Sequence, residues 1–252
     1  MTLKDAFFLA LVQGIAEWLP VSSSGHLAIL HHLFGLAGNV SFDIFLHLSS
    51  LFVIIIFSHK DISELIKVFL HRDFNSYNFK IILYIIFATV ITGIVGILLR
   101  QYLELIAQNF LPYTFLFTTI LLFLSNGKGE TRIDIKRALF IGFFQGIALI
   151  PGVSRSGATI SAAKITGVKD EDAFRFSFLL AVPAILGAVV YDIKDIDKIL
   201  FPFLLTGFLV SFFIGLGALY LLKKVVMRGR FYLFGFYTLF LSLVLLNLRI
   251  DF

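Results

Sequence analysis

Apolar residues form long runs along most of the chain, and within these runs they do not alternate with polar residues. A run of about 20 apolar residues crosses a bilayer as an α-helix, whereas the strands of a membrane β-barrel alternate in polarity. The pattern therefore predicts an all-α integral membrane protein. Six segments are expected to span the membrane: Phe42–Phe57, Ile81–Leu99, Leu111–Leu124, Phe174–Tyr191, Leu200–Leu222 and Phe231–Asn247.

Two further apolar stretches differ, because each runs into a cluster of proline, glycine and serine. Leu3–Leu19 leads into Pro20-Val-Ser-Ser-Ser-Gly25, and Ala138–Ile150 leads into Pro151-Gly-Val-Ser-Arg-Ser-Gly157. A short apolar segment follows each cluster. Helix, polar break and helix together predict a re-entrant hairpin, whose irregular backbone is tolerated at membrane depth only where protein or water surrounds it.

The two clusters belong to an internal repeat at an offset of 132 residues. Gln13-Gly-Ile-Ala16 matches Gln145-Gly-Ile-Ala148, and the serine and glycine positions that follow match in the same register. We expect one membrane domain made of two repeats, 1–125 with a hairpin over 3–36 and 126–252 with a hairpin over 138–168. Each half then holds one hairpin and three spans. Since three is odd, the second half is inverted, and such repeats place their site near the membrane midplane.

Composition supports this assignment and excludes several classes of protein. Hydrophobic residues make up 59% of the chain and charged residues 15%, against roughly 25% charged in soluble domains. The chain has no cysteine, which excludes disulfides and thiolate metal sites. No run of lysine and arginine resembles a nucleic-acid-binding arm, so no nucleic-acid partner is expected.

The basic residues are concentrated in alternate loops. The loops over 58–80, 125–137, 164–175 and 223–230 carry four, four, three and four of them, which is 15 of the 21 in the chain. Positive charge marks cytoplasmic loops. Both termini are therefore expected outside, with the first hairpin entering from the outer face and the second from the inner face.

The first hairpin contains a set of polar side chains, namely Gln13, Glu17, Ser22, Ser23, Ser24 and His26. Gln13 and Glu17 are four residues apart and share one helix face. A carboxylate at membrane depth is costly and should face a cavity. Each residue also has an ordinary interpretation: Glu17 or the serines as helix caps, and His26 as a hydrogen-bonded core histidine. Their combination favours a functional site.

The second hairpin contains Ser154, Arg155, Ser156 and Thr159. Arginine offers a planar fork to phosphate oxygens, and the N–H groups at the start of the following helix also attract an anion. A structural ion pair between Arg155 and Glu17 is the alternative. Together the two sets predict phosphoryl transfer, in which a serine or water attacks and a histidine or glutamate moves the proton.

Two other features are less informative. Asp43 and His47 are four residues apart near the end of the first span, and the sequence assigns them no role. The chain has no His-Glu-x-x-His motif, so a zinc hydrolase of that type is not supported.

The segments Gln13–His26 and Pro151–Thr159 resemble the two signature motifs of the undecaprenyl-diphosphate phosphatase family, the bacitracin-resistance type, and Phe176–Pro183 resembles a further family stretch. The resemblance covers the whole chain in length and hydropathy. It implies an enzyme of the bacterial inner membrane that removes one phosphate from undecaprenyl diphosphate, a polyprenyl diphosphate lipid, and so recycles the lipid carrier of cell-wall synthesis. It also implies bacitracin resistance, a divalent cation (Mg²⁺ or Ca²⁺) and a site open to the periplasmic side.

The resemblance also implies roles for individual residues. Glu17, Ser23, His26 and Arg155 are expected to be catalytic, and Glu17 is also the candidate metal ligand. Ser154 also matches a functional position of the family, and the other polar residues of the two hairpins, Gln13, Ser22, Ser24, Ser156 and Thr159, are expected with it to bind substrate. Many family members carry glutamate where this chain has Gln13, which weakens a base or metal-ligand role there.

Several alternatives stay open at this point. The favoured scheme has Ser23 attacking phosphorus with His26 as its base, and the rivals are attack by His26 itself or by water. A secondary transporter or lipid flippase is the other class of function, because inverted repeats with broken helices also occur there. The sequence does not decide whether the chain forms a homodimer.

Overall fold

The computed structural model describes residues 1–36, 40–192 and 199–248, and this part of the chain is helical. It forms no β-strand, and Thr131 and Val168 make an isolated bridge. The α-helices are α1 (Leu3–Ala16), α2 (Ser23–Phe34), α3 (Val40–Phe57), α4 (His59–Leu70), α5 (Tyr77–Leu99), α6 (Leu103–Asn109), α7 (Leu111–Leu124), α8 (Ile135–Ile147), α9 (Arg155–Ile165), α10 (Asp170–Asp192), α11 (Phe201–Met227) and α12 (Phe234–Leu248), with 3₁₀ turns at Arg100–Tyr102 and Phe231–Leu233.

Four of the described helices are long and apolar enough to cross a membrane: α5, α10, α11 and α12, the first and last counted with their adjoining 3₁₀ turns. Helices α3 and α4 meet at a bend of 73° and count as a fifth candidate when taken together. Helix α7 has 14 residues, fewer than the roughly 20 that a span needs. The chain is thus a multi-pass membrane protein, and each of the six predicted spans lies on a helix.

Both polar clusters form the predicted break between two helices. Helix α1 is followed by the turn that leads into α2, and α8 by the turn that leads into α9. The two second helices have matching caps: Ser22 Oγ accepts from the N–H of Gly25 at 3.3 Å, and Ser154 Oγ accepts from the N–H of Gly157 at 3.1 Å. These caps satisfy one of the N–H groups that a helix start leaves free.

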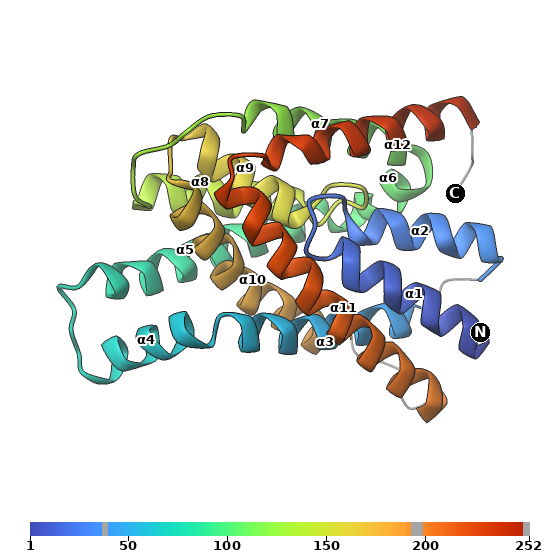
Figure 1. Cartoon of the computed structure of the whole chain (residues 1–252), viewed down its shortest axis with the longest axis horizontal. Helices are drawn as coiled ribbons and strands as arrows, with labels where there is room; N and C mark the ends of the chain where they lie inside the picture. Colours follow the sequence, from blue (N-terminus) through green and yellow to red (C-terminus); the bar gives the residue numbers. More distant parts are fainter. Residues whose placement is uncertain (37–39, 193–198, 249–252) are drawn as a thin grey trace.

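The two halves of the chain exchange their first helices, in the sense that the first helix of each half packs along a helix of the other half. Helix α1 packs along α11, and α8 packs along α5, while α3 meets α10 and α7 meets α12 (Figure 1). The glycines of the repeat allow this close packing. A Cβ at Gly14 would lie 2.8 Å from the carbonyl oxygen of Ser211 in α11, and a Cβ at Gly146 would lie 2.5 Å from a side-chain carbon of Val95 in α5.

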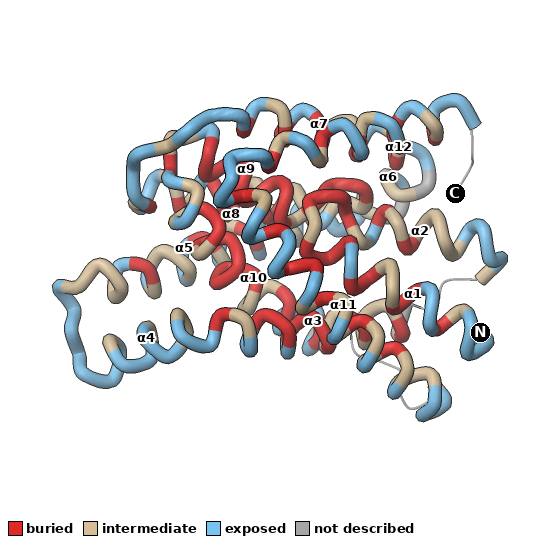
Figure 2. Tube along the Cα trace, in the orientation of Figure 1, coloured by how far each residue is buried: buried red, intermediate tan, exposed pale blue. Residues whose placement is uncertain are grey.

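Burial follows from this arrangement. Figure 2 shows the buried residues concentrated in the middle of the molecule, where the turns lie, and exposed residues along the ends and outer faces. Many of the exposed side chains are apolar, including Ile97 at 78%, Phe213 at 65% and Phe240 at 65%. Apolar surface of this extent is unsuited to water and suits lipid. The polar turns, in contrast, are largely buried, with Ser24 left exposed.

Candidate active site

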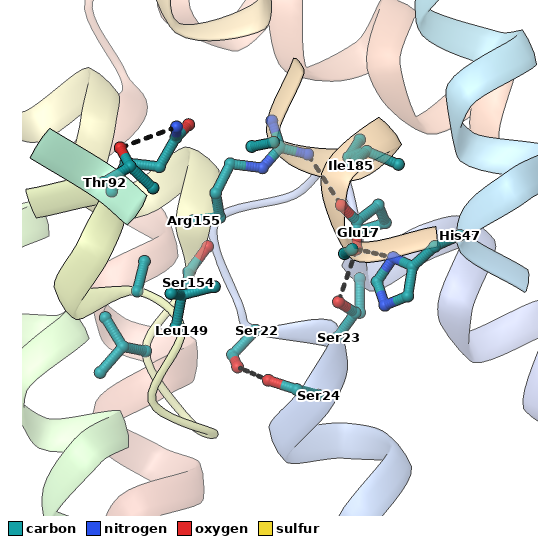
Figure 3. Close-up of a pocket in the computed structure, with 16 residues that line it drawn as sticks. Glu17, Ser22, Ser23, Ser24, His47, Thr92, Leu149, Ser154, Arg155 and Ile185 are labelled. Atoms are coloured by element: carbon teal, nitrogen blue, oxygen red, sulfur yellow. Dashed lines mark hydrogen bonds and ion pairs between the residues drawn. The ribbon is translucent and has the colours of Figure 1, made fainter. Parts of the chain in front are cut away.

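The two polar turns meet around a cavity of about 200 Å³. Figure 3 shows its polar side chains pointing toward one another from both hairpins and from neighbouring helices. The lining residues are Ala16, Glu17, Ser22, Ser23 and Ser24 of the first hairpin, Gln145, Ala148, Leu149, Val153, Ser154 and Arg155 of the second, His47 of α3, Thr92 of α5, and Ala184, Ile185 and Ala188 of α10. Six of the ten residues proposed from the sequence therefore share one cavity.

Glu17 is the centre of the polar network. Ser23 Oγ donates to Glu17 Oε2 at 2.7 Å, and Arg155 Nη2 donates to Glu17 Oε1 at 2.7 Å. The side chains of Glu17 and Arg155 are only 6% and 15% exposed, so each charge needs its partner. The ion pair that the sequence left as an alternative is present, and the same carboxylate also holds the serine hydroxyl.

Arg155 uses only one arm of its guanidinium in this pair. Its Nη1 is buried and has no hydrogen-bond partner among the described residues. The guanidinium carbon lies 5.7 Å from the ring centre of Trp18 and 5.8 Å from that of Phe178, at the range of cation–π contacts. The two rings flank the guanidinium, and Nη1 remains a donor that no described residue satisfies.

Both second helices begin at the cavity. Ser23 is the first residue of α2, and Arg155 is the first residue of α9. Free N–H groups and the positive end of the helix dipole favour negative charge at such a point. Ser22, which precedes α2, has a φ of 68°, a strained conformation for a residue with a side chain. The turn at Ser22 brings the Ser23 hydroxyl within hydrogen-bond distance of Glu17. The position that corresponds to Ser23 in the second half of the repeat is Arg155.

His26 has other partners. Its Nδ1 lies 2.7 Å from the carbonyl oxygen of Ser22, so Nδ1 carries the hydrogen, and its Nε2 lies 2.6 Å from the hydroxyl of Tyr237. The His26 and Tyr237 rings stack with an interplanar angle of 10°. The imidazole lines a second, apolar cavity of about 430 Å³ that includes residues of α1 and α12. The expected contact in which His26 takes the proton of Ser23 is not formed, because both ring nitrogens are engaged elsewhere and Ser23 donates to Glu17.

Three of the expected substrate-binding residues lie behind the cavity wall. Ser156 Oγ contacts Ser154 Oγ at 3.3 Å, and Thr159 Oγ1 donates to the Arg155 carbonyl at 2.8 Å. Gln13 is fully buried and its Nε2 donates to Glu17 Oε2 at 3.2 Å. None of the three is among the residues that line the cavity. They support the groups that do.

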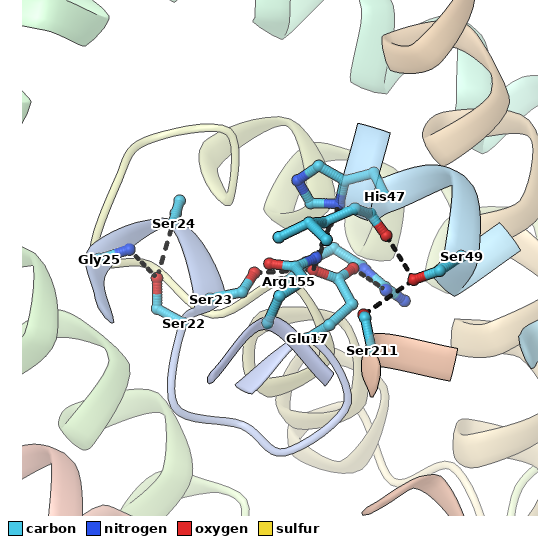
Figure 4. A network of polar contacts seen from close by, with 11 residues as sticks. Glu17, Ser22, Ser23, Ser24, Gly25, His47, Ser49, Arg155 and Ser211 are labelled. Atoms are coloured by element: carbon cyan, nitrogen blue, oxygen red, sulfur yellow. Dashed lines mark hydrogen bonds and ion pairs between the residues drawn. The ribbon is translucent and has the colours of Figure 1, made fainter. Parts of the chain in front are cut away.

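The structure adds three residues that the sequence did not assign to the site: His47, Thr92 and Gln145. His47 Nδ1 lies 3.5 Å from Glu17 Oε2 and 3.2 Å from Gln13 Nε2. Figure 4 shows His47 and Arg155 on the same network as Glu17. Asp43, which the sequence paired with His47 by spacing, instead binds His31 at 2.7 Å. The four-residue spacing from Asp43 was the only feature of the sequence that drew attention to His47.

The other two additions lie on the side of the second hairpin. Gln145 Nε2 donates to Thr92 Oγ1 at 3.2 Å. Gln145 is the repeat counterpart of Gln13, and this correspondence could have identified it. Nothing in the sequence distinguishes Thr92 from the other hydroxyl residues of the spans.

Comparison with known proteins finds a matching protein family and relatives that align over nearly the whole chain. A family model described as bacitracin resistance protein BacA matches residues 6–244. Relatives named undecaprenyl-diphosphatase include one from Korarchaeum cryptofilum, 36% identical with 98% of this chain and 100% of the relative covered. Another, from Methanococcus vannielii, is 37% identical with 95% and 97% covered. A third, from Treponema denticola, is 37% identical with 96% of each chain covered.

Proposed function

This chain belongs to the bacitracin resistance protein BacA family, and from that premise we infer that it hydrolyses undecaprenyl diphosphate to undecaprenyl phosphate and inorganic phosphate. The chain is a polyprenyl-diphosphate phosphatase, and its reaction returns the lipid carrier of cell-wall synthesis to use. Resistance to bacitracin agrees with the family's name. We place the enzyme in the cytoplasmic membrane with its site open to the outer side, because the loop charges make the hairpin that carries Ser23 enter from outside.

One observation carries the assignment of roles: a single buried carboxylate binds a serine hydroxyl with one oxygen and an arginine with the other. A serine is a weak nucleophile until a base takes its proton. Glu17 Oε2 is the acceptor in contact with Ser23, so Glu17 is the base. Ser23 Oγ then attacks the terminal phosphorus, the bond from that phosphorus to the bridging oxygen breaks, and undecaprenyl phosphate leaves.

Arg155 binds the transferred phosphate. Charge in phosphoryl transfer is spread over the non-bridging oxygens, and fixed cationic donors stabilise it. The Nη1 of Arg155, which has no partner among the described residues, is such a donor, and the N–H groups at the starts of α2 and α9 also favour negative charge there. Water then attacks the phosphoserine, and Glu17 returns its proton to Ser23 Oγ.

His26 affects the reaction indirectly, by holding the turn that precedes α2. Its Nδ1–H holds the carbonyl of Ser22, whose φ of 68° sets the position of Ser23. We therefore assign it a positioning role, with Tyr237 fixing the far side of the ring.

The divalent cation is held, in this proposal, by Glu17 and Gln13. Mg²⁺ takes oxygen ligands and is usually bound by one or two carboxylates together with substrate phosphates. The Oε1 of Gln13 is a buried amide oxygen without a partner in the described part of the chain, and it belongs to the side chain that contacts Glu17. Among the described residues, no group of three or more histidine, cysteine, aspartate or glutamate side chains could hold a metal ion. When bound, the cation neutralises diphosphate charge.

The same exchange of helices supports the finer topology. We propose two inverted repeats, 1–125 and 126–252, each with one re-entrant hairpin and three spans. The pairs α1–α11 and α8–α5 are equivalent under a two-fold axis that relates the repeats, and the pairs α3–α10 and α7–α12 lie across that axis.

The direct test is release of inorganic phosphate from undecaprenyl diphosphate by the purified protein in detergent. Wild type is expected to release phosphate, and Ser23→Ala to lose all but a trace of this activity. Ser63→Ala, which changes an exposed serine of α4, is the control and should match wild type. A folded wild-type protein that binds the lipid without releasing phosphate would instead indicate a transporter.

A further inference from the structure

Gln145 lines the cavity, and the orientation of its side-chain amide is fixed by its hydrogen bond. The residue is 1% exposed and its Nε2 donates to Thr92 Oγ1. The single hydroxyl hydrogen of Thr92 is directed to backbone carbonyls, those of Ala88 and Gly142, each at 2.9 Å. Thr92 can therefore only accept from Gln145. This fixes the orientation of the amide and leaves its Oε1 as the free atom.

That oxygen lacks a partner. Gln145 Oε1 is buried and makes no hydrogen bond within the described part of the chain, although its side chain lines the cavity. Leaving a buried acceptor unsatisfied is costly, so Oε1 calls for a donor from outside the described part of the chain. Phosphate oxygens are acceptors and do not meet the requirement. Water does, and the proposed hydrolysis consumes one.

The location of Gln145 agrees with the geometry of the reaction. In the view of Figure 3, Thr92, to which Gln145 is bonded, and Glu17 lie on opposite sides of Arg155, and Ser23 lies on the side of Glu17. Attacking and leaving oxygens in phosphoryl transfer are roughly in line. The lipid phosphate therefore leaves on the side opposite Ser23, and the water that opens the phosphoserine enters there.

We propose that Gln145 positions the hydrolytic water, an inference that rests on the proposed function. Gln145 Oε1 accepts a hydrogen bond from the water, whose oxygen then bonds to phosphorus. The bond from phosphorus to Ser23 Oγ breaks, Oγ takes back the proton from Glu17, and the product leaves as H₂PO₄⁻ with both water hydrogens. No base is needed on this side, which agrees with an amide at that position. The repeat thus uses its two glutamines differently: Gln13 supports the attacking serine, and Gln145 supports the water.

The test separates the two chemical steps by rapid quench with substrate labelled in the terminal phosphate. Gln145→Met keeps the size of the side chain and removes the acceptor. We expect its steady-state rate to fall about 10- to 100-fold, the scale of a misplaced reacting group, while labelled phosphoserine accumulates and undecaprenyl phosphate appears in a burst of about one per site.

Gln13→Met is the matched control, since it changes the equivalent residue on the side of Ser23. It should slow formation of the phosphoserine, so that the rate falls without accumulation. Thr92→Val removes the anchor of Gln145 and should show the accumulation to a smaller extent, which keeps the proposal testable if Gln145→Met does not fold.

An unchanged rate in Gln145→Met, or a lower rate with no accumulated phosphoserine, would overturn the proposal. Either outcome is distinct from failure of the proposed function, in which wild type releases no phosphate.

Discussion

At the scale of single residues, the site depends on the different surroundings of the two terminal nitrogens of the Arg155 guanidinium. One arm holds Glu17 at 2.7 Å, the other is buried without a partner in the described structure, and Trp18 and Phe178 flank the guanidinium. Lysine cannot reproduce this arrangement, because an ammonium is a point charge and lacks the planar fork. The residue therefore connects the two halves, and in the proposed mechanism its second arm binds the substrate phosphate.

Arg155→Lys is expected to lower kcat on the order of 10²-fold, the scale for loss of one donor to a developing charge. The pair with Glu17 can persist, so the protein should still fold. Phosphate release measured beside thermal unfolding in detergent checks both statements. Near-normal turnover would reassign Arg155 to a structural role.

His26 allows a sharper distinction, because the side chains of asparagine and glutamine each mimic one of its ring nitrogens. The amide nitrogen of asparagine reaches the position of Nδ1, and that of glutamine the position of Nε2. If His26 only holds the Ser22 carbonyl through Nδ1, His26→Asn should keep substantial activity and His26→Gln should lose most of it. Equal, near-complete loss in both variants would return His26 to the role of proton acceptor.

At the scale of elements, the position of the turns depends on how closely α1 and α8 approach the long helices. The repeat glycines have no room for a Cβ: Gly14 lies against Ser211 in α11, and Gly146 lies against Val95 in α5. Any side chain there pushes the hairpin away from its partner helix. Since Glu17 and Arg155 follow these glycines in their hairpins, such a shift would also open the site.

Gly14→Ala is expected to destabilise the protein by about 1–3 kcal/mol, the cost of overpacking a tight contact, and to lower activity with it. Gly217→Ala in α11 is the matched control. A Cβ there meets open space, and alanine favours the helix by up to about 1 kcal/mol. The comparison is made by thermal unfolding in the same detergent. A Gly14→Ala protein as stable as the control would contradict the close packing of α1 on α11.

At the scale of the whole molecule, the exchange of first helices joins the two halves into one unit. Neither half can enclose the cavity alone, because the first hairpin supplies Ser23 and Glu17 and the second supplies Arg155 and Gln145. The site therefore exists only where the repeats meet. Inverted repeats typically place their sites in this way.

The proposed inverted arrangement predicts opposite labelling of two loops. A cysteine at Asn75, between α4 and α5, should react with a membrane-impermeant reagent only from the cytoplasmic side, and one at Gln101, after α5, only from outside. The chain has no native cysteine, so the background is zero. Asp195 would be a natural further probe but lies outside the described residues. Reversed labelling of Asn75 and Gln101 would contradict the orientation drawn from the loop charges.

Local patterns determined much of this protein from its sequence alone. Apolar runs mark the helices, because membrane backbone must satisfy its own hydrogen bonds, and proline, glycine and serine mark the breaks before α2 and α9. The repeat and its motifs drew attention to Glu17, Ser23 and Arg155, which the structure places in one cavity and one hydrogen-bond network. The orientation predicted from the loop charges likewise rests on the sequence alone and stays a prediction.

Only the tertiary structure decided which side chains share the cavity. His26 is three residues from Ser23, yet its ring is held by Ser22 and Tyr237, the latter 211 residues away along the chain. Thr92 enters the site because α8, a helix of the other half, packs along α5. Such contacts depend on which of several similar apolar helices pack together and at what distance, and hydrophobic burial by itself is non-directional. The choice is made by close packing at positions such as Gly14 and Gly146, which becomes visible only when both halves are in place.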